Sequence, residues 1–123
     1  MNLKIVDGCY QVIKLRPSDE VPDNVFCGAF CSATKTDEEI SIVTDSDIEM
    51  ESDAVEKNWK IIKIDEILDF SLMGVLSKIS TILAESGISV FVVSTYNTDY
   101  IMVKEQYLDK AKKVLEENDY HFG

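Results

Sequence analysis

The clearest hydrophobic pattern along the chain lies in its second half. Residues 59–64 form a short run rich in β-branched and aromatic side chains, which is typical of a strand. Beyond this run, apolar residues recur at steps of three and four, at Leu72, Val75, Leu76, Ile79, Ile82 and Leu83. This spacing predicts a helix with one apolar face, and Gly87 is expected to end it. Either Asp69 or Ser71 is expected to cap its start.

The remaining pattern predicts a hairpin, a second helix and a last strand. Apolar runs at about 88–94 and 100–105 predict the two strands of the hairpin. The second helix is marked by Leu108, Ala111, Val114 and Leu115, and a short strand at 120–122 follows it. The predicted order is strand, helix, strand, strand, helix, strand. This is the ferredoxin-like βαββαβ arrangement, in which two helices cover one face of an antiparallel sheet.

The first half of the chain repeats part of this pattern. Residues 10–15 and 59–64 both read aromatic, polar, apolar, apolar, Lys, apolar, and they lie 49 residues apart. Residues 35–43 resemble residues 97–103, in each case the tip and return strand of a hairpin, and here the offset is 62. The second copy therefore holds 13 more residues between its first strand and its hairpin, which is between three and four turns of helix.

We therefore predict an α+β protein of two units in tandem, an abbreviated N-terminal unit at residues 1–58 and a complete C-terminal unit at residues 59–123. In the first copy, residues 16–29 stand where the long helix would be, and they contain Pro17 and Pro22. Because proline removes a helical hydrogen bond, we expect at most one helical turn there. The acidic stretch after the first hairpin is expected to supply another short helix.

Composition and charge restrict the classes of partner. With 123 residues, 46% of them apolar, the chain can bury a core without disulfides or metal. Three cysteines and no signal-peptide pattern indicate a reducing cytoplasm, in which Cys9, Cys27 and Cys31 serve as small buried residues. The net charge of −11 would repel phosphate backbones and anionic lipids, and no apolar run approaches the ~20 residues of a membrane span. We expect a cytoplasmic protein that binds neither nucleic acid nor membrane.

Metal and catalytic patterns are weak. Alternate acids occupy six positions of a calcium-loop pattern: Asp45, Asp47, Glu49, Glu51, Asp53 and Glu56. Met50 stands where that loop needs glycine, and a strand precedes the run, so we interpret it as a solvated acidic connection. The C-x₃-C spacing of Cys27 and Cys31 and the distant His121 do not form a zinc pattern. No nucleophile elbow or phosphate loop occurs, so we expect no metal, no cofactor and no catalysis.

The turn of the second hairpin, residues 94–100, reads STYNTDY and carries more polar groups than a plain turn needs. With the stretches DFSLMGVL at 69–76 and AESGISV at 84–90, it makes the sequence resemble the ACT domain family. The likeness is strongest to tandem ACT proteins related to the CASTOR-type arginine sensors. It covers residues 59–122 through its ordered motifs and residues 9–45 more loosely through the repeat.

This resemblance implies a regulatory module that binds an amino acid between the start of a helix and a strand of a neighbouring ACT unit, and that pairs as a homodimer. Carried over residue by residue, it implies ligand contacts from Gly74, Val75, Leu76, Thr95, Tyr96 and Asp99, to which Ser94 can add a hydroxyl. Amides at a helix start favour a carboxylate, and Asp99 can accept hydrogen bonds from an ammonium group. Leu72 replaces an acid of the arginine sensors, so a small or apolar amino acid suits the site better.

Each part of this hypothesis has a plainer alternative. In the turn, Thr98 or Asp99 could bond the local backbone and bind no ligand. Gly74 could allow close packing of the helix against the sheet. The whole protein could then be a structural dimerisation or protein-interaction module that keeps the fold without a ligand.

Overall fold

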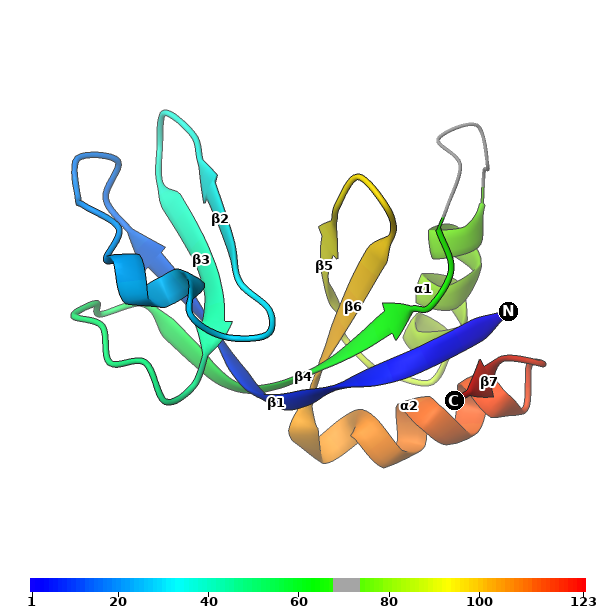
Figure 1. Cartoon of the computed structure of the whole chain (residues 1–123). Helices are drawn as coiled ribbons and strands as arrows, with labels where there is room; N and C mark the ends of the chain where they lie inside the picture. Colours follow the sequence, from blue (N-terminus) through cyan, green and yellow to red (C-terminus); the bar gives the residue numbers. More distant parts are fainter. Residues whose placement is uncertain (68–73) are drawn as a thin grey trace. The chain divides into compact units, whose positions relative to one another are not determined.

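The computed structural model describes residues 1–67 and 74–123, and the chain forms two compact units (Figure 1). The C-terminal unit combines residues 1–6 with residues 60–123, and the N-terminal unit consists of residues 7–59. The boundary between residues 59 and 60 lies one residue from the predicted boundary between residues 58 and 59. The first six residues, however, belong to the unit that the second half of the chain forms.

The C-terminal unit is a five-stranded sheet with two helices, and its strand order is β7–β1–β4–β6–β5. The predicted order of elements is confirmed: β4 (Val55–Ile64), α1 (Val75–Glu85), β5 (Phe91–Ser94), β6 (Asp99–Lys104), α2 (Leu108–Glu116) and β7 (His121–Phe122). A short 3₁₀ helix, η2 (Glu105–Tyr107), precedes α2. The additional strand is the beginning of β1 (Asn2–Leu15), which later continues into the N-terminal unit.

The sequence analysis missed this additional strand. The first residues of β1 pair in parallel with β7, and β1 separates β7 from β4. Leu3 is fully buried in the core of the unit. Asp7 and Gly8 resemble a break between strand and loop, but the strand continues through Gly8 at a φ of 104°. Glycine adopts this conformation readily, so an apparent strand breaker lies within a strand of 14 residues.

The core of the C-terminal unit lies between the two helices and one face of the sheet. Alternate strand residues and the apolar stripes of both helices form it, namely Leu3, Ile62, Ile64, Ile79, Leu83, Ile88, Ile101, Val103, Ala111 and Leu115. The predicted placement of both helices on one face is therefore confirmed for this unit. The expected capping residues Asp69 and Ser71, together with Leu72, lie outside the described residues.

Helix α1 ends as the sequence predicted. Gly87 has a φ of 76°, and its N–H donates to the carbonyl of Ala84 at 3.0 Å. The next N–H, of Ile88, donates to the carbonyl of Leu83 at 2.9 Å. This pair of bonds is the Schellman motif, in which a left-handed glycine satisfies the last carbonyls of a helix.

The N-terminal unit is a four-stranded sheet in the order β2–β3–β1–β4, with β2 at Ser32–Lys35 and β3 at Ile40–Asp45. The predicted hairpin is thus confirmed, and β3 pairs antiparallel with both β1 and β2. In place of a long helix the unit has one 3₁₀ turn, η1 (Asp23–Phe26), which confirms the expected limit of one turn. A small apolar cluster holds the unit together: Ile13, Leu15, Val25, Ile40 and Ile42.

The segment between β3 and β4 forms turns, so the prediction of a short helix there is wrong. The N–H of Asp47 donates to Oδ1 of Asp45 at 2.9 Å. Gln11, which is 2% exposed, donates from Nε2 to the carbonyls of Asp45 at 2.9 Å and of Ile48 at 2.6 Å. An aspartate that bonds the backbone two residues on competes with helix formation, and the buried amide takes carbonyls that a helix would use.

The alignment of the two hairpins differs from the predicted one by three residues. Both turns span four residues, 36–39 and 95–98, and their flanking pairs are Lys35 with Ile40 and Ser94 with Asp99. The hairpins are therefore equivalent at an offset of 59, not 62. Thr36 and Thr95 both occupy the first position of their turns, whereas the predicted offset of 62 had aligned Thr36 with Thr98.

The expectation that all three cysteines are buried is wrong. Cys27 is exposed, and Cys9 and Cys31 are partly exposed. Cys27 and Cys31 lie in the irregular connection between η1 and β2, outside the apolar cluster of the unit. Among residues 1–67 and 74–123, no group of His, Cys, Asp or Glu is arranged to hold a metal ion, and no helix is long and apolar enough to cross a membrane.

Candidate ligand-binding site

A cavity of about 580 Å³ lies at the start of α1 in the C-terminal unit. The start of α1 and the segment that follows α2 supply most of its lining: Met1, Gly74, Val75, Ser77, Lys78, Asn118, Asp119 and Tyr120. Two of the predicted ligand residues, Gly74 and Val75, are among them. We call this space the α1 cavity.

Gly74 is needed for its backbone conformation. Its φ is 84°, and a Cβ atom added there would meet no described atom within 4 Å. Close packing against the sheet therefore does not explain this glycine within the described part of the chain. The left-handed residue turns the chain directly into α1, whose first helical bond runs from the N–H of Lys78 to the carbonyl of Gly74 at 3.0 Å.

The start of α1 can hold an anion. No described side chain caps it. The amides of the first helical turn have no acceptor within the helix, and their N–H bonds point toward the end of α1 at which the cavity lies. The helix dipole adds partial positive charge at this end, and the exposed ammonium group of Lys78 lies in the same cavity lining. The predicted residue Leu76 is not part of the cavity lining, and its side chain packs against the core.

The segment after α2 brings a carboxylate to the same cavity. The last carbonyls of α2 are occupied: Leu115 accepts from the N–H of Tyr120 at 3.1 Å, and Val114 accepts from Nδ2 of Asn118 at 2.7 Å. Asp119, with a φ of 69°, follows the helix in a left-handed conformation. Its carboxylate is therefore the acidic group of the lining. Burial raises the pKa of Tyr120 above its ordinary value of 10.0.

The predicted residues of the STYNTDY turn do not line the α1 cavity. Ser94 and Asp99 face each other as the last pair of the β5–β6 ladder, and Tyr96 at the tip is 81% exposed. Figure 1 shows this turn and the start of α1 at the same end of the C-terminal unit. The structure therefore brings Gly74 and Val75 together in one cavity and places the turn residues outside it.

Thr95 is engaged within the turn itself. Its N–H and its hydroxyl both donate to the carbonyl of Thr98, at 2.9 and 3.0 Å, and its Oγ1 accepts from the N–H of Thr98 at 3.4 Å. The sequence analysis assigned such local bonds to Thr98 or Asp99, whereas in the structure the hydroxyl of Thr95 makes them. Thr98 behaves differently, because its hydroxyl donates to the carbonyl of Ile64 on β4 at 2.8 Å.

The sequence analysis missed the side chains that line the α1 cavity beyond Gly74 and Val75. Lys78 lies off the apolar stripe of α1, which marks it only as a solvated residue. The segment 118–120 follows a helix end that the sequence did predict, but nothing in its pattern relates it to a helix start some forty residues earlier. Only the fold brings these two helix ends together.

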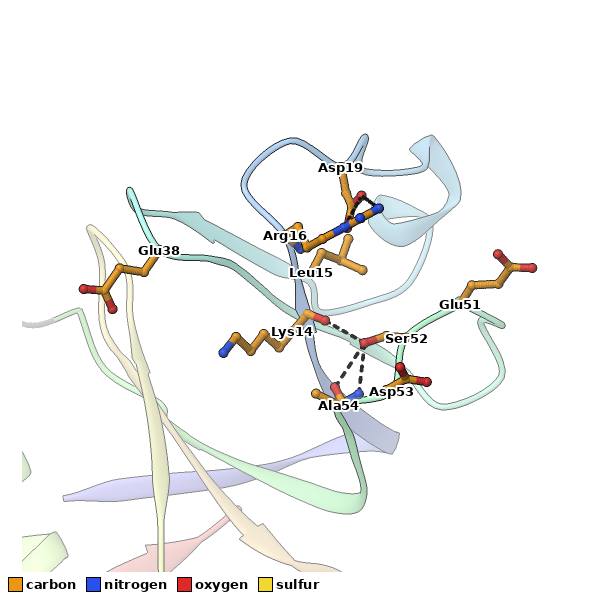
Figure 2. A pocket seen from close by; sticks show the side chains of 9 residues that line it. All are labelled: Lys14, Leu15, Arg16, Asp19, Glu38, Glu51, Ser52, Asp53 and Ala54. Carbon is orange, nitrogen blue, oxygen red and sulfur yellow. Dashed lines mark hydrogen bonds and ion pairs between the residues drawn. The ribbon is translucent and has the colours of Figure 1, made fainter.

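A second pocket, of about 710 Å³, lies in the N-terminal unit (Figure 2). The end of β1 and the segment before β4 form much of its wall. Ser52 joins them, since its hydroxyl donates to the carbonyl of Lys14 at 2.6 Å and accepts from the N–H of Ala54 at 3.1 Å. This wall is fixed by hydrogen bonds, and the buried side chain of Leu15 contributes its apolar part.

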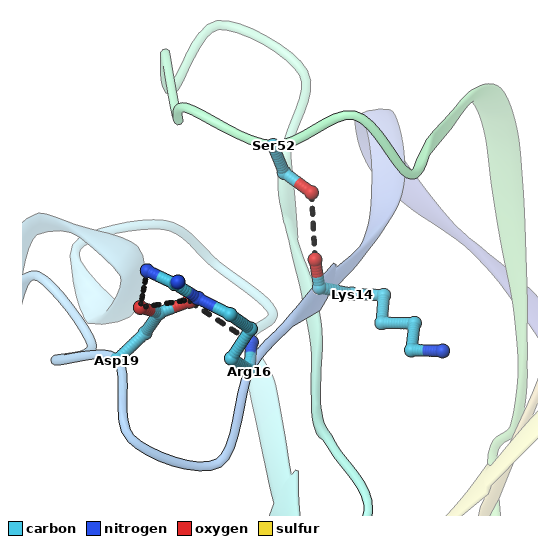
Figure 3. A network of polar contacts seen from close by, with 4 residues as sticks. All are labelled: Lys14, Arg16, Asp19 and Ser52. Carbon is cyan, nitrogen blue, oxygen red and sulfur yellow. Dashed lines mark hydrogen bonds and ion pairs between the residues drawn. The ribbon is translucent and has the colours of Figure 1, made fainter.

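The charges of this second pocket do not suit a carboxylate. Arg16 is paired with Asp19, with Nη2 and Nε at 2.9 and 3.2 Å from Oδ1, and Figure 3 shows the guanidinium turned onto that carboxyl group. The pair lowers the pKa of Asp19 and raises that of Arg16. Apart from this pair, the lining carries Lys14 against three acids, Glu38, Glu51 and Asp53. The pocket therefore has an acidic excess.

Comparison with known proteins agrees with this fold. The family model described as ACT domain matches residues 54–117, more than half of the sequence. The chain therefore belongs to the ACT domain family, whose members are generally regulatory modules that bind small molecules. A second family model, described as an N-terminal domain, matches residues 8–48. The mixed fold with an antiparallel sheet fits this family, and the structure places the two matches mainly in different units.

Several solved structures are similar to the whole chain. A protein from Agrobacterium tumefaciens is 31% identical, with a TM-score of 0.90, over 99% of this chain and 91% of that one. A protein of unknown function from Vibrio cholerae, described as a possible transport protein, is 21% identical with a TM-score of 0.72, over 94% and 88% of the two chains. The aspartokinase alpha and beta subunits are 14% identical with a TM-score of 0.66, over 95% and 96%. No curated protein matches the sequence.

Proposed function

We propose that this protein is a non-catalytic regulatory module that senses an amino acid, in the manner of the tandem ACT proteins related to the CASTOR-type sensors. The observation that carries the proposal is the α1 cavity, where a helix start without a described side-chain cap opens beside a lysine and an aspartate. Donors for a carboxylate and an acceptor for an ammonium group thus line one space, which suits a zwitterion. We further propose that it acts as a homodimer in the cytoplasm.

In this proposal, the amides of Gly74, Val75 and Leu76 bind the ligand carboxylate, with Lys78 adding charge. The STYNTDY turn belongs to the site through Asp99, together with Ser94, Thr95 and Tyr96, and it lies at the same end of the C-terminal unit as the start of α1 (Figure 1). The half-buried position of Asp99 at the first residue of β6 supports this role. The cavity residue Asp119 is the competing acceptor for the ammonium group.

The second candidate function is a structural dimerisation or protein-interaction module with no ligand. One observation favours it, namely that the hydroxyl of Thr95 is already satisfied within the turn. A turn whose polar groups bond each other needs no ligand to explain them.

A thermal-shift screen against the common L-amino acids, with their D-enantiomers as controls, separates the two functions. A ligand present at 100 times its dissociation constant stabilises the folded state by about 2.7 kcal/mol. We expect one or a few small or apolar L-amino acids to raise the melting temperature. If none does so at millimolar concentration, the sensor proposal fails and the interaction module takes its place.

Two substitutions locate the acceptor of the ammonium group. If the turn supplies it, Asp99→Asn abolishes the ligand-induced shift and Asp119→Asn preserves it. The opposite result assigns the ammonium group to the α1 cavity alone and removes the turn from the site. Asp37→Asn, in the tip of the other hairpin, is the matched control and should leave the shift unchanged.

A further inference from the structure

The hydroxyl of Thr98 joins the STYNTDY turn to a strand far away in the sequence. Thr98 is 4% exposed, and its Oγ1 donates to the carbonyl of Ile64 at 2.8 Å, across 34 residues of chain. Thr98 is the last residue of the turn and Ile64 is the last residue of β4. The bond therefore fixes one end of the turn to the point where β4 leaves the sheet.

The turn does not need this bond for its own shape. The hairpin of the N-terminal unit forms the same four-residue turn, in which the N–H of Thr36 donates to the carbonyl of Glu39 at 2.9 Å, as that of Thr95 does to Thr98. Glu39 occupies the position equivalent to Thr98. The same turn is thus built with a glutamate at the position where the other hairpin has its buried threonine.

Ile64 also connects to the start of α1. Its side chain is fully buried in the core cluster of the C-terminal unit, and Val75 and Leu76 pack against the same cluster. Ile64 therefore holds the turn through its carbonyl, and its side chain belongs to the core cluster against which the first turn of α1 packs. Packed cores transmit small displacements because they have few voids to absorb them.

We propose that Thr98 is a positioning residue that keeps the STYNTDY turn in register with the start of α1, acting through Ile64. This inference rests on the proposed function, since it couples the two elements to which ligand binding is assigned. Thr98 itself contacts no ligand. Loss of its hydroxyl lets the turn and the helix start move independently, which weakens a site that depends on both.

Hydrogen exchange of the protein without ligand tests the coupling directly. Three amides report on it: Thr95 in the turn, Lys78 at the start of α1 and Thr36 in the other turn. Thr98→Val should speed exchange at Thr95 and Lys78 about fivefold, the factor that corresponds to one typical net hydrogen bond. Exchange at Thr36 should not change. The serine variant Thr98→Ser keeps the donor and should exchange like the wild type.

The chain offers a closely matched control in Thr44. This residue is fully buried, and its Oγ1 donates to the carbonyl of Val25, also at 2.8 Å, within the N-terminal unit. If Thr98 only stabilises the fold, Thr44→Val and Thr98→Val lower the melting temperature alike, and Thr98→Val speeds exchange at the amide of Ile88, at the far end of α1, as much as at Lys78. That result would overturn the proposal.

Calorimetric titration with L-alanine, L-valine and L-leucine separates this inference from the proposed function. For a probe that binds the wild type, Thr98→Val should raise the dissociation constant about fivefold, with Thr44→Val and Thr98→Ser unchanged. Unchanged binding in Thr98→Val would contradict the positioning role. If no probe binds the wild type but the exchange at Thr95 and Lys78 responds together, the coupling stands and the sensor function fails. Should Thr98→Val not fold, hydrogen exchange of the wild type decides. Coupled elements open together, so the amides of Thr95 and Lys78 must give the same free energy of opening, and different values would contradict the coupling.

Discussion

The two hairpin turns of the molecule share one geometry and differ in chemistry. Thr36 and Thr95 occupy the first position of each turn, and both make the same backbone bond and the same hydroxyl contacts to the last residue. The difference lies at the next position, where Ile40 belongs to the core of the N-terminal unit and its equivalent in the C-terminal unit is Asp99. The shared threonine is therefore turn chemistry, and the half-buried acid is the feature specific to the C-terminal unit.

The two units also differ in net charge. The N-terminal unit carries 13 acidic and 4 basic residues, and the C-terminal unit carries 10 acidic and 8 basic residues. Most of the net charge of −11 thus belongs to the smaller unit. The near balance of the C-terminal unit leaves its α1 cavity able to accept a zwitterion, whereas the acidic excess around the second pocket opposes a carboxylate.

Exchanging the residues that differ between the turns should give the largest effect. Ile40→Asp places a charge in the small apolar cluster of the N-terminal unit, where Ile40 is 4% exposed, and should lower the free energy of unfolding by about 4 kcal/mol. The reverse change, Asp99→Ile, should alter it by less than about 1 kcal/mol because Asp99 is only half-buried. Urea denaturation of both variants measures this. Similar losses in the two would show that Asp99 is as much a structural residue as Ile40.

The dependence of the C-terminal unit on the start of β1 should give the next effect. Leu3→Ala removes a fully buried side chain from the core of that unit and should cost about 3 kcal/mol of unfolding free energy. The exposed neighbour Lys4 provides the control, and Lys4→Ala should stay within about 0.5 kcal/mol. Denaturant titration followed by circular dichroism checks both. A small loss for Leu3→Ala would mean that the C-terminal unit does not rely on this strand.

The fold was predictable from the sequence to the extent that it depends on local pattern. The apolar stripe of α1, Gly87 and the two hairpins were each visible in residues close together along the chain. The strand at residues 2–6 was not, because its partner β7 lies at the other end of the sequence. The α1 cavity was half predictable for the same reason: Gly74 follows from a motif, whereas Asp119 reaches the site only through tertiary packing.

Because Thr36 and Thr95 are equivalent, removal of either hydroxyl should lower the free energy of unfolding by the same amount. Thr36→Val and Thr95→Val each remove one hydroxyl that bonds within its own turn, so each should lower the free energy of unfolding by about 1 kcal/mol. The two values should agree within about 0.5 kcal/mol. Thermal and urea denaturation without ligand provide them. A clearly larger cost at Thr95 would mean that its hydroxyl does more than shape the turn.

Alkaline pH should destabilise the N-terminal unit more than the C-terminal unit, and this is the smallest of the expected effects. Burial, followed by the carboxylates of Asp45 and Asp7, raises the pKa of Tyr10 above its ordinary value of 10.0. The folded state therefore holds this proton more tightly than the unfolded state does. The resulting stability is complete below pH 10.0 and is lost as the pH rises through the folded-state pKa. In urea titrations between about pH 8 and 11, Tyr10→Phe should flatten this decline. Tyr120, whose pKa is raised by burial alone, should matter less.

The parallel pairing of β1 with β7 has a consequence for the order of folding. Asn2 pairs with His121, so the sheet of the C-terminal unit closes only when the two most distant parts of the sequence meet. Contacts of such high sequence separation slow folding because the loop entropy is lost before the contact is gained. During synthesis, the strand that carries Leu3 is made long before β7, with which it pairs in parallel. The N-terminal unit, which consists of residues 7–59, can fold in the meantime.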